Sequence, residues 1–169
     1  QEYIDKDAPD IYPEELRYDI DALNDVIYAD VNLAVNLAAL AGTQEEYEYY
    51  YDLVFDRLDW LEERLSTRRY LMGDTITSPD IRLFVTLTRF DLVFYQKYLL
   101  NKKRLVDYPN LWNYAKDLFS NPAFGGNTDF NSMRLRFYYV DHTPFADMPR
   151  LMPKGPDDSR WLEPNDRAE

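Results

Sequence analysis

The stretch LMGDTITSPDIRLFVTLTRFD, residues 71–91, decides the fold of this 169-residue chain. Thr77 and Asp80 form a Thr-x-x-Asp helix cap, and Pro79 stands in the first turn, where its missing amide proton is not needed. Apolar residues follow at helical spacing and occupy more than one side. The pattern predicts a helix over residues 81–100 that packs in the centre of the domain.

Two further long helices are predicted upstream of this stretch. The first carries an apolar residue every three or four positions from Leu16 onward and ends near Gly42. The second begins at a capping box, in which the Thr43 hydroxyl accepts the Glu46 amide and the Glu46 carboxylate returns to the Thr43 amide. The short connection makes these two helices an antiparallel hairpin.

Downstream of the stretch, residues 111–118 predict a helix that ends before Asn121-Pro122, since a residue preceding proline disfavours the α region. A last short helix is predicted over 130–140. The expected fold is all-α, a bundle of about five to six helices. The expected organisation is a linker or N-terminal extension over 1–12, a helical domain over 13–142 and an extended tail over 143–169.

Charge and composition restrict the partners. The formal net charge is −12, which argues against a nucleic-acid surface, and the chain has no run of apolar residues long enough for membrane insertion. We therefore expect a cytoplasmic protein. Asp outnumbers Glu and Arg outnumbers Lys, a halophilic-like balance that also fits an ordinary acidic protein. The chain has no cysteine, which excludes a thiol nucleophile, and no ligand spacing indicates a metal site.

Other polar and aromatic residues have modest expected roles. His142 is the single histidine and has no partner at motif spacing, so a structural role is expected. Arg82, Arg89 and Asp91 lie in an apolar helix and predict buried ion pairs. Four tyrosines between residues 47 and 51 cover several sides of their helix, which favours an interface with another domain or subunit.

The stretch 71–91 resembles the C-terminal domain of glutathione transferases, through Gly73, Thr77 and Asp80. A narrower resemblance points to the xi class, the glutathionyl-hydroquinone reductases. It rests on DIYPE (10–14), IDALN (20–24), LDWLEERL (58–65), DIRLF (80–84), DYPNL (107–111), Tyr138-Tyr139, His142 and Gly155-Pro156. The resemblance implies a two-domain enzyme whose thioredoxin-like first domain carries the catalytic cysteine and uses glutathione as co-substrate. This chain is expected to start where the linker ends and to be inert alone.

The resemblance also implies that this half supplies the wall of a hydroquinone pocket and the contact of a homodimer. Tyr138, Tyr139 and Tyr95 are the pocket tyrosines expected to remain. Phe94 and Asn36 stand where the family has further tyrosines, so two phenol hydroxyls are lost. Three functions stay open: half of a reductase, a non-catalytic helical subunit of a larger protein assembly, and a stand-alone module that binds an aromatic ligand.

Overall fold

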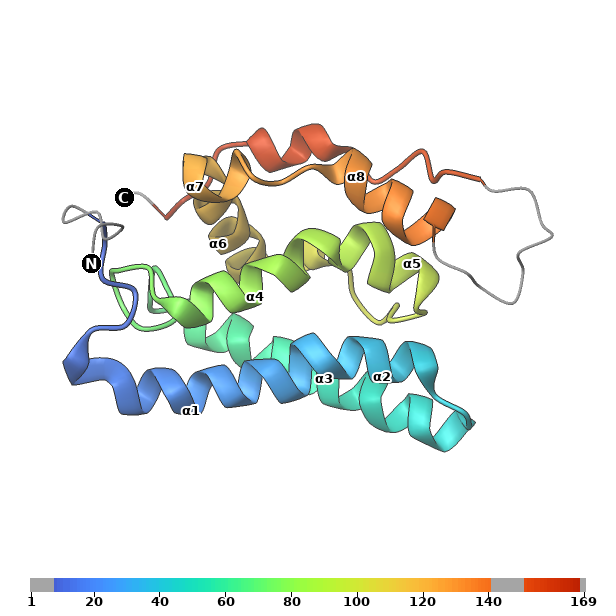
Figure 1. The fold of residues 1–169 in the computed structure, drawn as a ribbon, viewed down its shortest axis with the longest axis horizontal. Coiled ribbons are helices and arrows are strands. Elements are labelled where there is room, and N and C mark those ends of the chain that lie inside the picture. The colour runs from blue at the N-terminus through green and yellow to red at the C-terminus, as the bar shows by residue number, and fades with distance from the viewer. Residues whose placement is uncertain (1–7, 141–150, 168–169) are drawn as a thin grey trace, which may run out of the picture.

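The computed structural model describes residues 8–140 and 151–167, and its regular elements within these ranges are helices, with an isolated bridge between Tyr70 and Gly73. The all-α prediction is confirmed. Figure 1 shows α1 and α4 side by side, with α3 behind the first helices and α7 and α8 above α4.

The first predicted helix forms as one continuous rod with a change of hydrogen-bonding pattern in its middle. A 3-10 turn at Glu14–Leu16 leads into α1 (Arg17–Ile27), a π-helical segment (Tyr28–Leu33) and α2 (Ala34–Leu40). The predicted apolar stripe faces the core, and the small residues Ala34 and Ala38 are buried. Their size lets α2 approach α3 closely.

The second helix, α3 (Gln44–Leu65), begins where the cap predicts. The Thr43 hydroxyl accepts a hydrogen bond from the Glu46 amide at 3.2 Å. The return bond differs from the prediction, because the Glu46 carboxylate accepts from the Gly42 amide at 2.9 Å rather than from Thr43. The Glu46 side chain thus fixes the turn between α2 and α3 as well as the start of α3.

The central helix consists of α4 (Ser78–Arg89), a π-helical segment (Phe90–Phe94) and α5 (Tyr95–Lys97). Its cap is built around the fully buried Asp80 carboxylate. This carboxylate accepts from the amides of Leu71 at 2.9 Å and Thr77 at 2.8 Å, and from the Tyr114 hydroxyl at 2.8 Å. One side chain therefore joins α4, the preceding turn and α6. Gly73 in that turn has φ of 127°, a conformation that favours glycine.

The remaining elements cover α4. They are α6 (Pro109–Ser120), α7 (Pro122–Gly125), α8 (Phe130–Arg134) and a π-helical segment (Leu135–Val140), with a 3-10 turn at Leu105–Asp107 before them. α6 ends before Asn121-Pro122 as predicted, because the Asn121 backbone is extended and its side chain caps α7.

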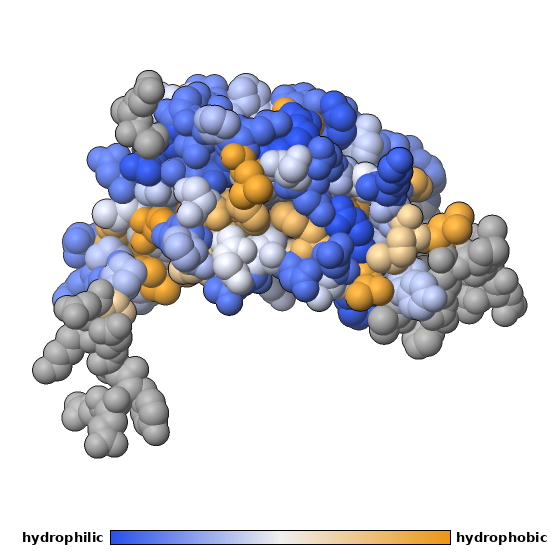
Figure 2. Space-filling model, turned by 90° about the horizontal axis from the view of Figure 1, so that it is seen from above, coloured by the Kyte–Doolittle hydropathy of each residue, from blue (hydrophilic) through white to orange (hydrophobic). Residues whose placement is uncertain are grey.

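The tail is more structured than the sequence predicts. Residues 158–162 form a 3-10 helix (Asp158–Leu162), and Trp161 is buried against Trp112 with ring centroids 4.9 Å apart. Arg134 holds the segment by pairing with the Asp158 carboxylate at 2.6 Å. Viewed from above, this side of the molecule is hydrophilic over much of its area, with apolar residues gathered along a band through its middle (Figure 2).

Candidate functional site

Two of the predicted pocket residues are packed in the core beneath the last helical segment. Phe94 is buried, and its ring centroid lies 5.3 Å from Tyr98 and 6.4 Å from Phe137. The Tyr138 hydroxyl donates to the Leu92 carbonyl at 2.7 Å, and burial raises the pKa of Tyr138. This phenol therefore ties the 135–140 segment to the central helix, and its proton is engaged in that bond.

The other three predicted residues lie at separate places. Tyr139 is 47 % exposed. Tyr95 is half-buried and lines a cleft on the side of α5. Asn36 is exposed on α2, where its side-chain amide donates to the Asn32 carbonyl at 2.9 Å. In the described residues the five do not converge on one enclosed pocket.

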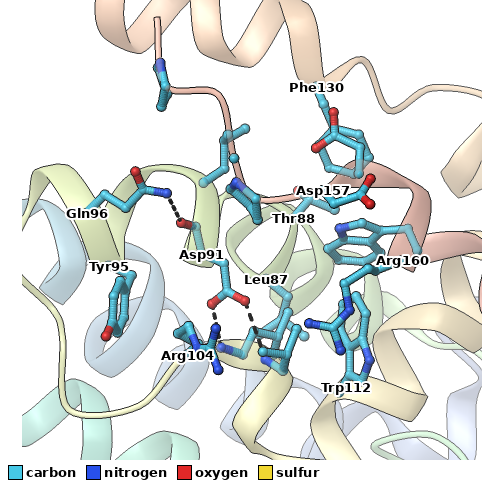
Figure 3. A pocket seen from close by; sticks show the side chains of 18 of the residues that line it. Leu87, Thr88, Asp91, Tyr95, Gln96, Arg104, Trp112, Phe130, Asp157 and Arg160 are labelled. Carbon is cyan, nitrogen blue, oxygen red and sulfur yellow. Dashed lines mark hydrogen bonds between the residues drawn. The ribbon is translucent and has the colours of Figure 1, made fainter.

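The cleft beside Tyr95 has a volume of about 470 Å³ and is closed on one side by residues 153–161 of the tail (Figure 3). Its apolar wall includes Leu87 and Trp112. The Asp91 carboxylate points into the fold and accepts hydrogen bonds from the backbone amides of Leu105 and Val106. Burial raises the pKa of Asp91. Asp91 therefore fixes the turn before α6, which is a structural role.

A second face, formed by α4 and by the start of the π-helical segment that continues α1, exposes apolar side chains together. Tyr28 is 51 % exposed, Ile81 38 % and Val85 46 %. The Arg82 guanidinium lies over the Tyr28 ring, 5.6 Å from its centroid, and connects the two helices. Ile81 and Val85 are one turn apart on α4 and therefore share a side of that helix. These four residues, Tyr28, Ile81, Arg82 and Val85, are called the α1–α4 face below.

Asparagines join the two helices along this face. The Asn32 side-chain amide donates to the Thr86 hydroxyl at 2.6 Å and to the Arg82 carbonyl at 3.1 Å. Asn24 donates to the Ser78 hydroxyl at 3.0 Å. Asn24, Asn32 and Asn36 are separated by multiples of four residues, a spacing visible in the sequence that the sequence analysis missed. The α1–α4 face is thus apolar with a row of amides beside it.

The predicted ion pairs of the central helix are wrong within the described residues. Arg82 bonds instead to the Asn24 side-chain carbonyl at 3.1 Å, and Arg89 bonds to the Val85 carbonyl. Asp91 is satisfied by backbone amides, as described above. Neutral acceptors satisfy these arginines, and burial lowers the pKa of Arg89.

The four predicted capping residues lie at the starts of helices and stabilise those helix ends. Thr43 and Glu46 lie at the start of α3, and Thr77 and Asp80 at the start of α4. Across the described ranges no group of three or more His, Cys, Asp or Glu side chains could hold a metal ion. No helix within those ranges is long and apolar enough to cross a membrane. His142 lies outside the described residues.

Comparison with known proteins identifies the family to which this chain belongs. Residues 44–117 match the glutathione S-transferase C-terminal domain family. The chain belongs to that family. The glutathionyl-hydroquinone reductase PcpF of Sphingobium chlorophenolicum is 39 % identical over 147 residues, which are 87 % of this chain and 46 % of that protein.

Solved structures agree with this assignment. A glutathione transferase from Gordonia bronchialis superposes with a TM-score of 0.90 at 44 % identity, covering 98 % of this chain and 51 % of that one. The glutathione-bound structure of YqjG from Escherichia coli superposes with a TM-score of 0.86 at 34 % identity, over 95 % and 51 % of the two chains. The chain spans about half the length of the curated relatives it matches. The resemblance to the xi class of glutathione transferases is confirmed.

Proposed function

We propose that this chain is the pocket-forming and dimerising C-terminal half of a glutathione transferase that reduces glutathionyl-hydroquinones to hydroquinones. Two observations support the reaction class: a relative named as such a reductase is 39 % identical, and another relative's structure contains glutathione. In this proposal the helical domain spans 13–142, residues 1–12 lead in from a thioredoxin-like domain, and the enzyme works in the cytoplasm.

The α1–α4 face carries the proposal. Tyr28, Ile81 and Val85 expose apolar surface together, and Arg82 and the neighbouring asparagines supply hydrogen-bonding groups beside it. An apolar centre with polar groups around it is typical of a surface covered by another domain. A thioredoxin-like domain seated on this face would bring its cysteine to the helical surface near Asn36.

The proposed reaction needs a cysteine that this chain does not contain. The thiolate attacks the sulfur of the glutathionyl thioether, a disulfide forms, the carbon–sulfur bond breaks, and the ring carbon takes a proton. A second glutathione then resolves the mixed disulfide and restores the thiolate, so that glutathione disulfide leaves. The helical half would shape the pocket. Among its predicted tyrosines, Tyr139 is 47 % exposed, and we place it at the quinol side of the pocket.

The experiment is a turnover assay on the full natural gene product with a glutathionyl-hydroquinone and free glutathione. The proposal predicts release of one hydroquinone and one glutathione disulfide per substrate. It also predicts loss of both when the upstream cysteine is replaced by serine. No release by a product that contains both domains and binds glutathione would overturn the proposal.

A second candidate function is a non-catalytic helical subunit that binds a protein partner. It is favoured by Tyr49, which is 63 % exposed and in edge contact with Tyr50 at 5.1 Å. Of the same stretch, Tyr47 and Tyr51 pack against the core, and the Tyr47 hydroxyl bonds to the Leu99 carbonyl at 2.7 Å. The exposed surface here is therefore one or two rings wide. Turnover by the natural product would decide for the enzyme.

A further inference from the structure

A second hollow lies between α1 and α3 and shares no lining residue with the cleft beside Tyr95. Its volume is about 630 Å³. Apolar side chains form one wall and cationic side chains from α3 and the turn after it form the other. The apolar wall includes Leu16, Val26 and Met72, and the cationic wall includes Arg57, Arg64 and Arg68. The residues of this hollow are called the α1–α3 groove below.

Three arginines in the groove follow one side of α3 and its end. Arg57 and Arg64 are seven residues apart on α3, which is two helical turns and places them on the same side of that helix, and Arg68 follows in the turn after its end. The guanidinium groups of Arg57 and Arg64 both lie over the Trp60 ring, 5.0 and 5.4 Å from its centroid. Trp60 is 41 % exposed and holds these two side chains at the groove.

Neutralisation of these arginines is incomplete. Arg57 pairs with Asp30 at 2.6 Å. Arg64 instead donates to the Leu71 carbonyl at 2.9 Å, and Arg68 has no hydrogen bond or ion pair from its guanidinium in the described part of the chain. Burial lowers the pKa of Arg64, and the nearby positive charge of Arg68 lowers it further.

The charges that face the groove leave room for one anion. Arg57, Arg64 and Arg68 contribute three positive charges, while Asp19 and Asp30 contribute two negative ones. A surplus of one positive charge stands out in a chain whose net charge is −12. Arg69, by comparison, pairs with the Asp117 carboxylate at 3.0 Å.

We propose that the α1–α3 groove binds a small organic anion, with its carboxylate or phosphate group on Arg64 and Arg68 and its apolar body along Leu16, Val26 and Met72. The planar guanidinium offers parallel N–H donors that match the oxygens of such a group. The groove volume lies within the range of small-molecule sites, and one wall is apolar as those sites require. This site is independent of the proposed reductase reaction.

The experiment uses the fluorescence of Trp60, taken as the difference between the parent protein and its Trp60→Phe variant. Trp112 and Trp161 are only 7 % and 8 % exposed, so Trp60 is the readily quenched indole among the described residues. Iodide, an anionic quencher, is compared with acrylamide, a neutral one. We expect Arg68→Gln to reduce iodide quenching of Trp60 about threefold, because one of the three positive charges that line the same groove is removed, and to leave acrylamide quenching unchanged.

The matched control is Arg104→Gln, which removes the same charge from an exposed residue that does not line the groove. It should leave both quenchers unaffected. Arg68 is exposed, and within the described ranges its guanidinium has no hydrogen bond or ion pair, so its variant will fold. Arg64→Gln is measured second. Unchanged iodide quenching in Arg68→Gln would overturn the proposal.

The apolar body of the ligand is tested by protection from iodide at constant ionic strength. Hexanoate should protect Trp60 at lower concentration than inorganic phosphate, because its chain lies on Leu16 and Val26. Chloride at the same ionic strength should protect least. Equal protection by all three anions would overturn the assignment of an organic ligand and would show screening alone.

Discussion

The inner and outer sides of α4 differ in what they offer their surroundings. On the inner side, the Asp80 carboxylate is fully buried and accepts hydrogen bonds from Leu71, Thr77 and Tyr114. On the outer side, Ile81 and Val85 are exposed. The inner side has every polar group satisfied within the chain, and the outer side leaves apolar surface uncovered. We infer that the inner side folds the domain and that the outer side serves a second domain.

The largest expected effect comes from breaking the inner side. Asp80→Ala leaves the amides of Leu71 and Thr77 and the Tyr114 hydroxyl buried without an acceptor, which costs about 3 kcal/mol or more in the free energy of unfolding. Urea unfolding followed by circular dichroism measures this. Asp80→Asn retains one acceptor oxygen and should lose less. An Asp80→Ala variant as stable as the parent would contradict the assigned role of the cap.

Removing the donor of the hydrogen bond between Tyr114 and Asp80 should destabilise the protein less than removing the Asp80 carboxylate. Tyr114→Phe removes only the hydroxyl that donates to Asp80, and the ring still fills its buried site. We expect a loss of about 1.5–3 kcal/mol in the free energy of unfolding, the usual contribution of a hydrogen bond to a charged group. The double variant with Asp80→Ala should lose less than the sum of the two, since both remove one bond.

The buried tyrosines near the inner side also predict that the protein loses stability at high pH. Burial raises the pKa of Tyr70 from 10.0 to about 12 and raises that of Tyr114 well above its usual value. The unfolded chain ionises these groups first, so stability is full below pH 10 and is lost as the pH rises toward 12. The free energy of unfolding should fall by at most about 1.4 kcal/mol per pH unit for each of these tyrosines. Tyr70→Phe should make this fall of stability with pH less steep. A free energy of unfolding that does not change between pH 9 and 11.5 would contradict the burial of these tyrosines.

The outer side should tolerate a change that the inner side cannot. Val85→Asp places a charge on an exposed position and should alter the stability of this chain by about 0.5 kcal/mol or less. In the two-domain protein the same change should lower hydroquinone release, because the charge would be buried at the domain contact. Leu162→Asp, at an apolar residue of the tail that is 78 % exposed, is the matched control. Equal turnover of both variants would argue against the α1–α4 face as a contact.

Much of the fold is predictable from local sequence. The caps at Thr43 and Thr77 and the proline at 122 determine where helices begin and end, and these are short-range signals. The π-helical segments at Tyr28–Leu33 and Phe90–Phe94 are not predictable in this way, because their apolar spacing reads as ordinary helix. The packed tail also depends on a distant contact, the pairing of Arg134 with Asp158.

The candidate site is less predictable than the fold. The family resemblance predicts that Tyr138 is a pocket phenol, but its hydroxyl donates a hydrogen bond to the Leu92 carbonyl. Arg89 reads as half of an ion pair, but a backbone carbonyl accepts its proton. Both depend on which backbone atoms come near after packing, and sequence spacing does not contain that information. The α1–α3 groove is also not predictable from sequence spacing, because it forms only where Trp60 and the arginines pack beside α1.

The intact mass of the natural gene product tests most directly whether the outer side of α4 serves a second domain. A second domain on the outer side of α4 predicts a mass larger than the 20.2 kDa of this chain by about one domain, with a cysteine in the added part. A natural product of 20.2 kDa would contradict the account and leave the helical chain as a binding or assembly subunit.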